Sequence, residues 1–261
     1  EDALDLAADA LAAPVGLRTL SPELAHRFAQ MVRVAGGDTP VLILGETGTG
    51  KEVIARALHG QGDRPGELIT VNCGALPETL VESELFGHRR GAFSGATTDR
   101  VGAAQAADRG TLFLDEIGEL PVLAQAALLR LIQEREVTPL GATRPVPLDL
   151  RIIAATNRDL PALVTAGGFR ADLYARLGGH TVLLPPLRRR RQDLGLLVAA
   201  LLTEIAGDGA AQLRFERGAL RALVRHDWPL NIRELKNVLR AAVSLSDGRT
   251  IRLAHLPSLI R

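Results

Sequence analysis

The sequence predicts an α/β fold in which a parallel sheet flanked by helices is followed by a small all-helical subdomain. From Pro40 onward, short apolar runs alternate with amphipathic stretches, which is typical of a helix-covered parallel sheet. The pair Pro185-Pro186 ends this alternation, and the sequence after it has helical periodicity. With 261 residues, 46% of them hydrophobic, the chain can bury one sizeable core and a smaller second one. The expected segments are a helical lead-in at 1–39, an αβ subdomain at 40–186 with a loop insertion near 86–96, and a helical subdomain at 187–261.

The individual elements follow from the period of the apolar residues and from the turn residues between them. An amphipathic helix is expected from Pro22 to Val34, and it ends at the Gly36-Gly37-Asp38 turn. The tail from Gly248 to Arg261 is expected to be irregular. Strands are expected at Val41 to Leu44, Leu68 to Val71, Thr111 to Leu114, Arg151 to Ala155 and Thr181 to Leu184; helices are expected from Lys51, near Glu78, near Gln125, after Asp159, and at Leu194 to Ile205, Glu216 to His226 and Asn231 to Leu245.

Composition excludes several classes of protein. The 31 basic and 30 acidic residues nearly cancel, so no overall field would attract nucleic acid or an anionic membrane. Cys73 is the only cysteine, which rules out a disulfide or a thiolate metal cluster within one chain; it is expected to be a small buried hydrophobe. No apolar run was expected to reach the roughly 20 residues of a membrane span, and no signal pattern opens the chain. The composition favours a cytoplasmic protein with no membrane partner.

A glycine-rich turn connects an expected strand to an expected helix. Its sequence is Gly45-Glu46-Thr47-Gly48-Thr49-Gly50-Lys51. In this context the glycines let backbone N–H groups converge on phosphates, and the lysine reaches the outer phosphates. Glu52 follows the lysine, where the general pattern has the Ser or Thr that contacts Mg²⁺. The segment predicts a site for a nucleoside triphosphate.

Paired carboxylates end the apolar strand that runs to Leu114. Asp115 is expected to orient Mg²⁺, and Glu116 is expected to activate the attacking water. An Asp-Glu pair after a strand is also typical of a helix N-cap, so the catalytic role depends on the phosphate loop upstream. Asn157 follows the next strand and is a candidate to hold the attacking water or the γ-phosphate; a turn or a helix cap is its alternative.

Several arginines lie outside these two motifs. Arg170 and Arg176 are too far apart for one helical face, so they are expected to make different contacts, such as a contact to the γ-phosphate across a subunit boundary. Surface salt bridges are the alternative for this pair. Arg233 lies near the start of an expected helix and could turn toward bound phosphates. The run from Arg188 to Arg191 has no interleaved aromatic residue, so it is expected to form a solvated or interdomain face.

A glycine-bounded aromatic residue stands between the phosphate loop and the paired carboxylates. The hexapeptide Gly91-Ala92-Phe93-Ser94-Gly95-Ala96 follows Glu84-Leu85-Phe86-Gly87-His88. Alone, such a hexapeptide would be read as a surface turn with a buried Phe. Between two nucleotide motifs it suggests a loop that pushes on a partner.

Taken together, these residues resemble the central ATPase domain of bacterial enhancer-binding proteins, the AAA+ activators of sigma-54 RNA polymerase. The likeness covers nearly the whole chain, and Glu52 is the residue that the family has after the lysine. The family assigns Walker A to residues 45–52, a switch asparagine that holds the catalytic glutamate to Asn72, Walker B to Thr111 to Glu116, sensor I to Asn157, paired arginine fingers to Arg170 and Arg176, sensor II to Arg233, and the sigma-54 contact loop to Gly91 to Ala96 with Phe93 and Ser94.

The resemblance implies an AAA+ αβ domain with a helical lid that assembles as a homo-hexamer or heptamer. ATP and Mg²⁺ would be bound between neighbouring subunits. Hydrolysis would be relayed from Glu116 and Asn72 to the loop around Phe93 and would remodel the closed promoter complex of the sigma-54 RNA polymerase holoenzyme. The chain looks like a fragment of a longer activator, so no direct DNA binding is expected from it.

The chain departs from the family pattern at four places, one of which is the unusual Gly178-Gly179 pair after Arg176. Ser94 replaces a threonine and so lacks one methyl group, which is worth about 0.8 kcal/mol when buried. Ala104-Gln105 replaces Phe-Glu, and Leu230 replaces a glycine. These departures keep open an AAA+ remodeller of another protein target. A nucleotide-gated switch without turnover is the third hypothesis, and the complete set of acids and arginines argues against it.

Overall fold

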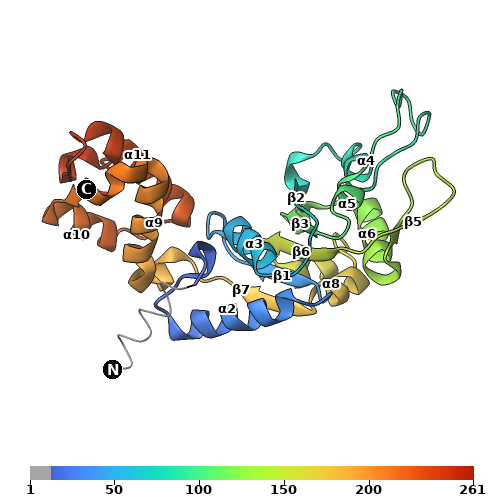
Figure 1. Ribbon diagram of the computed structural model, residues 1–261, viewed down its shortest axis with the longest axis horizontal. Coiled ribbons are helices and arrows are strands. Elements are labelled where there is room, and N and C mark those ends of the chain that lie inside the picture. Colours follow the sequence, from blue (N-terminus) through green and yellow to red (C-terminus); the bar gives the residue numbers. More distant parts are fainter. Residues whose placement is uncertain (1–12) are drawn as a thin grey trace. The chain divides into compact units, whose positions relative to one another are not determined.

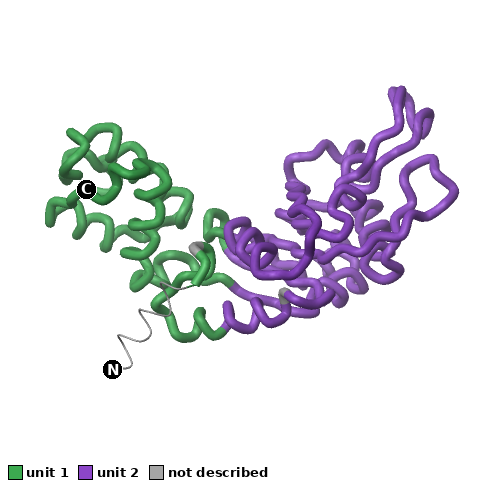
Figure 2. Tube along the Cα trace, in the orientation of Figure 1, with its two compact units in different colours: residues 1–26, 46–50, 184–261 green, residues 27–45, 51–183 purple. Residues whose placement is uncertain are grey.

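The computed structural model describes residues 13–261, apart from the side chains of Val15 and Ala35. The first twelve residues of the helical lead-in expected at 1–39 lie outside these residues. The described chain forms two compact units (Figure 2). A helical unit contains residues 46–50 and 184–261 together with the chain up to residue 26, and a sheet unit contains residues 27–45 and 51–183. The three-part division expected from the sequence stays a prediction.

The sheet unit is built on five parallel strands in the order β2-β3-β6-β1-β7 (Figure 1). The inner strands β3 and β6 are almost continuously buried, as expected for a parallel sheet covered on both faces. The predicted strands are confirmed, with ends that shift by one residue at most. Their bounds are β1 Val41–Leu44, β2 Leu68–Asn72, β3 Thr111–Asp115, β6 Arg151–Thr156 and β7 His180–Leu183.

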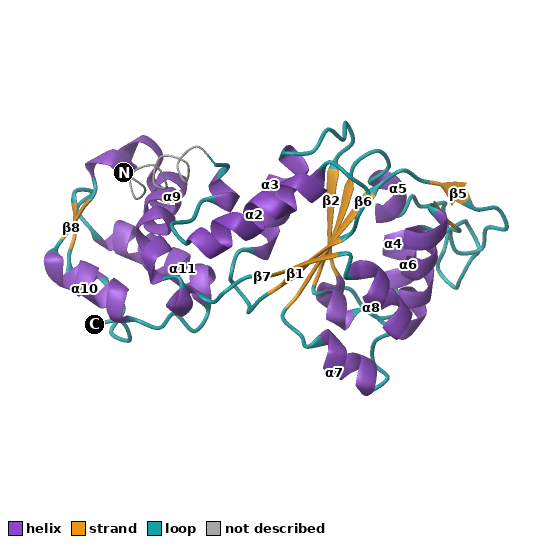
Figure 3. Cartoon of the chain, turned by 90° about the horizontal axis from the view of Figure 1, so that it is seen from below, coloured by secondary structure: helices purple, strands orange, loops and turns teal. Residues whose placement is uncertain are grey.

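Helices cover both faces of this sheet. Figure 3 shows α3 on one face and α4, α6 and α8 on the other. The core between the second group and the sheet contains Leu85, Leu114, Leu128 and Leu173, all fully buried. The helix expected near Glu78 begins at Val81, and the other expected helices of this unit are confirmed. Their bounds are α2 Pro22–Ala35, α3 Lys51–Gly60, α4 Val81–Phe86, α5 Ala103–Ala106, α6 Val122–Glu134, α7 Leu160–Thr165 and α8 Ala171–Leu177.

Two loops project from the same end of the sheet unit and lie side by side (Figure 1). The first joins α4 to α5, and the second contains the hairpin of β4 (Glu136–Val137) and β5 (Val146–Pro147). The backbone N–H of Arg89 donates to the carbonyl of Leu140 at 2.9 Å, so the bases of the two loops are hydrogen-bonded. The sequence indicated the first loop and missed the hairpin.

The helical unit packs around the only tryptophan of the chain. Trp228 is 1% exposed, its indole N–H donates to the carbonyl of Leu223 at 3.1 Å, and the ring of His226 meets it edge-on with 4.8 Å between centroids. The expectation of an irregular tail was wrong in part, because Thr250–Ile251 pairs in parallel with Arg214–Phe215. The elements of this unit are α9 Leu194–Ala206, α10 Arg217–Arg225, α11 Asn231–Leu245 and the strands β8 and β9.

One stretch contradicts the expectation that no apolar run is long enough to span a membrane. Residues Arg191–Gln212 are long and apolar enough to cross a membrane by length and composition alone. Leu194, Leu201 and Leu202 of this stretch are nevertheless buried in the core of the helical unit. The stretch includes the leucine-rich helix α9 and short turns on either side of it, and three of the leucines of α9 form part of a protein core.

Candidate active site

The carboxyl ends of the five parallel strands meet at one edge of the sheet, and the predicted polar residues of the sheet unit lie along it. Asn72 at the end of β2 pairs in register with Asp115 at the end of β3. Asn157 follows β6, and Gly45 follows β1; the N–H of Gly45 donates to the carbonyl of Thr156 at 3.2 Å. Ligands of open α/β sheets bind outside this edge, so the topology brings these candidates together.

Lys51 is the first residue of α3 and is 6% exposed. Its ammonium group donates to the carbonyl of Gly45 at 3.0 Å, so the side chain folds back over the turn that joins β1 to α3. Glu52 is exposed and pairs with Arg56 one helical turn later at 2.7 Å. The structure therefore turns Glu52 along its own helix rather than toward the strand ends.

The phosphate-loop residues 46–50 belong to the helical unit, where they contact the start of α11. Gly48 has φ +78°, and a Cβ there would lie 2.2 Å from the carbonyl oxygen of Leu230. Only glycine meets both conditions. The carbonyl of Gly48 accepts from the N–H of Ile232 at 2.8 Å, and the Cβ of Arg233 lies 3.0 Å from the same ideal Cβ position. The exposed Arg233 thus lies beside the loop, and its contact with phosphates stays a prediction.

Glu46 joins this loop to two residues of the helical unit. Arg188 donates to its two carboxylate oxygens at 2.6 and 2.8 Å, and Asn231 donates to one of them at 3.2 Å. The hydrogen bonds from Arg188 hold the pKa of Glu46 at about 2, below the ordinary value of 4.5. Asn231 is fully buried, and it also donates to the carbonyl of Thr47 and accepts from the N–H of Leu187.

The arginine run from Arg188 to Arg191 differs from a uniformly solvated face. Arg190 is 4% exposed, and its guanidinium donates to the carbonyl of Thr49 at 2.8 Å. Burial lowers the pKa of Arg190. Arg191 pairs with Asp227 at 2.6 Å on the surface. Two members of the run therefore hold the phosphate loop, and a third forms an ordinary surface ion pair.

Glu116 stands in a left-handed backbone conformation with φ +52° directly after β3. Its N–H donates to the carboxylate of Asp115 at 3.0 Å. Within residues 13–261, the Oε2 atom of Glu116 is buried without a hydrogen-bond partner. The Oδ1 atom of Asn72 accepts from the N–H groups of Gly74 and Ala75, so this oxygen binds the turn that follows it. Strain and an unpaired buried oxygen are features that accompany functional sites.

Asn157 lies in the turn after β6, and the structure shows which residue of this turn caps the next helix. Asp159, two residues later, is the N-cap of α7 and accepts from the N–H of Ala162 at 3.0 Å. Asn157 is exposed and leaves the helix cap to Asp159. The neighbouring Arg158, which sequence reasoning missed, donates to the carbonyl of Gly118 at 2.9 Å and thereby ties this turn to the one after Glu116.

Arg170 and Arg176 lie at the two ends of α8. Arg170 precedes the helix and donates twice to the carboxylate of Asp172, at 2.7 and 3.0 Å. These bonds hold the pKa of Asp172 below its usual range. The side chain of Arg170 remains 41% exposed, and Arg176 is exposed in the last turn of α8. Both arginines are accessible to a second molecule, and Arg170 carries a local carboxylate partner.

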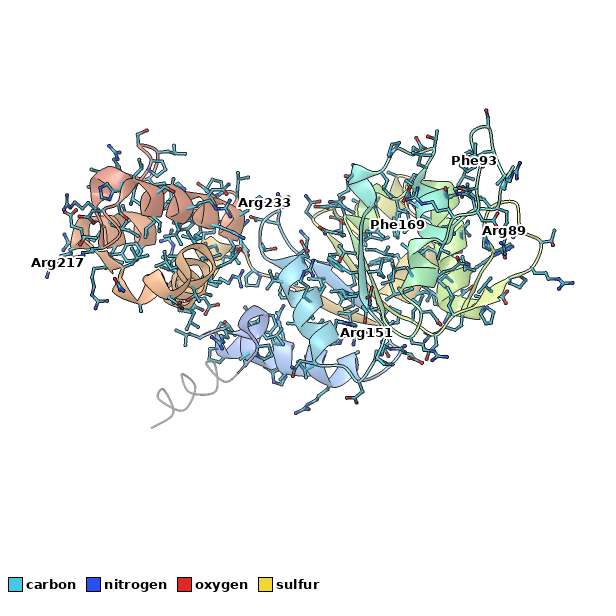
Figure 4. The ribbon with its side chains drawn as sticks, turned by 45° about the horizontal axis from the view of Figure 1, so that its top comes forward. Arg89, Phe93, Arg151, Phe169, Arg217 and Arg233 are labelled. Carbon is cyan, nitrogen blue, oxygen red and sulfur yellow. The ribbon has the colours of Figure 1, made fainter. Side chains whose placement is uncertain are left out.

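Phe93 lies on the projecting loop between α4 and α5 (Figure 4). Its side chain is 39% exposed, and its ring meets that of His88 edge-on with 5.0 Å between centroids. The loop closes on itself where the N–H of Gly91 donates to the carbonyl of Ala96 at 2.8 Å. Ser94 is exposed, so a methyl added there would contact solvent in this state. The exposed Phe contradicts the surface turn with a buried ring.

Ala104 and Gln105, which depart from the family pattern, lie in α5 at the base of this loop, whereas Leu230 precedes α11 in the helical unit. Ala104 is fully buried in α5, and Gln105 accepts from the N–H of Gly102 at 3.4 Å. Leu230 has φ −102°, a conformation open to any residue, and its side chain is 54% exposed. The replacement of glycine at Leu230 therefore introduces no backbone strain.

The donor set fits a metal that is held mainly by phosphate and water. Among residues 13–261, no group of three or more His, Cys, Asp or Glu side chains could hold a metal ion. Asp115 offers one half-buried carboxylate at the strand edge, beside the unpaired oxygen of Glu116. Mg²⁺ commonly binds through one or two carboxylates plus substrate phosphates, so this arrangement suits Mg²⁺ bound together with a nucleotide.

Comparison with known proteins gives the family. The model for the sigma-54 interaction domain matches residues 17–183, and the model for the AAA+ ATPase lid domain matches residues 188–261. The transcriptional regulatory protein ZraR of Salmonella typhimurium is 48% identical over 96% of this chain and 57% of its own length. Regulatory protein AtoC of Escherichia coli is 47% identical over 93% of this chain and 53% of its own length.

Solved structures agree with the sequence relatives. NtrX from Brucella abortus in complex with ADP superimposes with a TM-score of 0.82 at 32% identity, over 92% of this chain and 54% of that one. Its complex with ATP gives 0.81 at 32% identity, over 90% of this chain and 53% of that one. The chain thus spans about half the length of the relatives it matches. By its sequence, its sheet order and its lid, this chain belongs to the sigma-54 interaction domain family of AAA+ ATPases.

Proposed function

We propose that this domain hydrolyses ATP and uses the energy to remodel sigma-54 RNA polymerase holoenzyme through the loop from Gly91 to Ala96. The observation that carries the proposal is the exposed Phe93 on a projecting loop of the same unit whose strand edge carries Lys51, Asp115 and Glu116. A protein remodeller requires a site that hydrolyses the nucleotide and a surface that contacts the partner, and this unit carries candidates for both.

The nucleotide would be held by the backbone N–H groups of residues 45–51 and by Lys51. The related protein NtrX was solved in complex with ADP and with ATP, which supports ATP as the ligand of the present chain. Mg²⁺ bound with the nucleotide would neutralise phosphate charge, and Asp115 would hold it. Glu52 and Arg233 complete the set of nucleotide contacts that the family implies, with Arg233 beside Gly48.

Glu116 would accept the proton of the attacking water, because its buried Oε2 atom has no hydrogen-bond partner among the described residues. Asn157 would orient this water from the neighbouring strand, and Asn72 would hold Glu116 until the γ-phosphate is contacted. Arg170 and Arg176 are exposed, and they would stabilise the charge on the γ-phosphate of the next subunit in a homo-hexamer or heptamer. Arg170 would exchange Asp172 for phosphate at that moment.

The partner and the location follow from the same family. Relatives are transcriptional regulators, so we propose a cytoplasmic activator that opens closed promoter complexes and that makes no direct DNA contact and no membrane contact with this domain. An AAA+ remodeller of another protein is the alternative, and it rests on the exposed Ser94, whose missing methyl removes contact area only in a complex.

Substitution of Phe93 by Ala tests the proposal. The variant should keep ATP turnover and lose at least about tenfold in sigma-54 affinity, because truncating an aromatic hot spot at an interface costs about 2 kcal/mol or more. Binding is measured with ADP and aluminium fluoride, which imitates the transition state. Val101→Ala is the matched control, since Val101 is an exposed apolar residue of the same loop. Unchanged sigma-54 binding by Phe93→Ala would remove the assigned role of the loop.

A further inference from the structure

Gln125 is a fully buried polar residue on α6, a helix whose other buried residues are apolar. Its neighbours on the buried face include Ala124, Leu128 and Leu129, which belong to the main core of the sheet unit. A buried amide requires hydrogen-bond partners, and its partners identify its role.

The Gln125 amide forms hydrogen bonds with backbone groups of two different loops. The Nε2 group donates to the carbonyl of Leu120 at 2.7 Å and to the carbonyl of Gly168 at 3.0 Å. The Oε1 atom accepts from the N–H of Arg170 at 2.8 Å. The exchanged orientation of the amide would place donor against donor and acceptor against acceptor, so the partners permit only one orientation.

In the proposed function, one of these loops follows the catalytic base Glu116, and the other carries Arg170, which serves the neighbouring subunit. Leu120 ends the short helical turn Ile117–Glu119, which begins directly after Glu116. Arg170 is the N-cap of α8 and the first of the two exposed arginines. Phe169, directly before Arg170, is 2% exposed and belongs to the core of the sheet unit (Figure 4), so the arginine loop is anchored in the core while the side chain of Arg170 remains 41% exposed.

We infer that Gln125 is a positioning residue that sets the place of Arg170 from the loop that follows Glu116. This inference rests on the proposed function, in which Arg170 serves the ATP of the neighbouring subunit. A displacement of the Glu116 loop then moves Leu120, the amide of Gln125 and the backbone of Arg170 together. Each subunit would thus report the state of its own site to the site of its neighbour.

Mixed rings test this inference. Glu116→Gln subunits supply the arginine without the base, and Arg170→Ala subunits supply the base without the arginine. Each variant alone should be inactive, and the mixture should regain ATP turnover at the mixed interfaces. Absence of this complementation would contradict the transfer of Arg170 between subunits, which belongs to the proposed function, independently of Gln125.

Gln125→Leu is then introduced into one of the two kinds of subunit at a time. On the Glu116→Gln subunits, which donate the arginine, it should lower turnover of the mixture at least about tenfold with an unchanged KM for ATP, because the hydrogen bonds of Gln125 go to Leu120, Gly168 and Arg170 rather than to the phosphate loop. On the Arg170→Ala subunits, it should lower turnover less than twofold. Gln133→Leu, at an exposed position of the same helix, is the matched control and should have no effect on either side.

An equal loss on both sides, or a loss only on the Arg170→Ala side, would overturn the inference, since Gln125 would then act on its own active site. Gln125→Met preserves the length of the side chain and serves as the second variant. Folding is checked by circular dichroism and ring assembly by light scattering. If both variants failed to fold, the inference would also be overturned, because Gln125 would be a folding residue.

Discussion

Cys73 is the single cysteine of the chain, and it lies 2% exposed directly after β2. Burial raises the pKa of its thiol from 9.0 to about 12, and the nearby Asp115 adds to the shift. Three pKa units lower the thiolate fraction at neutral pH roughly a thousandfold. We expect negligible alkylation by iodoacetamide at pH 7.5 in the native protein and one modified thiol per chain in guanidinium. Rapid native labelling, followed by mass spectrometry, would contradict the burial.

The Glu46 carboxylate makes stability depend on pH in a defined range. Its folded pKa of about 2 lies below the ordinary value of 4.5, so its contribution to the free energy of unfolding is complete above about pH 4.5 and is lost as pH falls toward 2. The pair with Arg188 is partly exposed, so the contribution is small. Glu46→Gln should unfold at lower urea than wild type at pH 6, and the difference should shrink toward pH 2.5.

Arg188→Met is the matched variant for this measurement, which uses circular dichroism to follow unfolding. It removes the other half of the same ion pair and should reproduce the pH profile of Glu46→Gln, and the double variant should lose little more than either single one. A Glu46→Gln difference that stays constant between pH 6 and 2.5 would show that the pair does not set the pKa.

At the scale of elements, the two projecting loops behave as a pair. Gly141 in the hairpin loop has φ +75°, and a Cβ there would lie 2.9 Å from the Cβ of Ala92 in the hexapeptide. Gly141→Ala therefore combines backbone strain with a clash against the proposed contact loop. We expect weaker sigma-54 binding with unchanged ATP turnover, and a loss of stability beyond the roughly 1–2 kcal/mol that a left-handed backbone costs an alanine.

Gly248→Ala separates the two contributions, because Gly248 has φ +78° and no atom within 4 Å of its ideal Cβ position. The control should lose stability from strain alone and keep sigma-54 binding. Urea titrations give the stabilities, and binding is measured with ADP and aluminium fluoride. Equal effects of the two substitutions on binding would show that contact between the loops does not matter.

At the scale of the whole molecule, the proposed function requires a second copy of the chain, because it assigns the two exposed arginines to the ATP of a neighbouring subunit. The specific ATPase activity should rise with protein concentration as rings form, while that of Arg170→Ala should stay low at every concentration. Light scattering on the same samples gives the mass of the assembly. A specific activity that is constant with concentration, together with a monomeric mass, would contradict the contribution of arginine from a neighbour.

Much of this molecule could be predicted from local sequence. The apolar run Val41 to Leu44 and the glycine-rich turn after it specify a strand and a loop within a few residues. The partner of Arg188 could not be predicted, because Glu46 lies 142 residues away and either residue alone resembles an ordinary surface charge. The pair of β8 and β9 was missed because each strand has two residues. The roles of Gln125 and Arg158 appear only when loops distant in sequence meet.

Trp228 gives the helical unit an optical signal of its own. It is the only tryptophan of the chain, so the intrinsic emission excited near 295 nm comes from this one indole. The indole stands between Leu223 of α10 and the turn that leads into α11, whose first residues contact the phosphate loop. Unlabelled protein therefore suffices to follow the opening of this unit in a fluorimeter, in real time and without an attached dye.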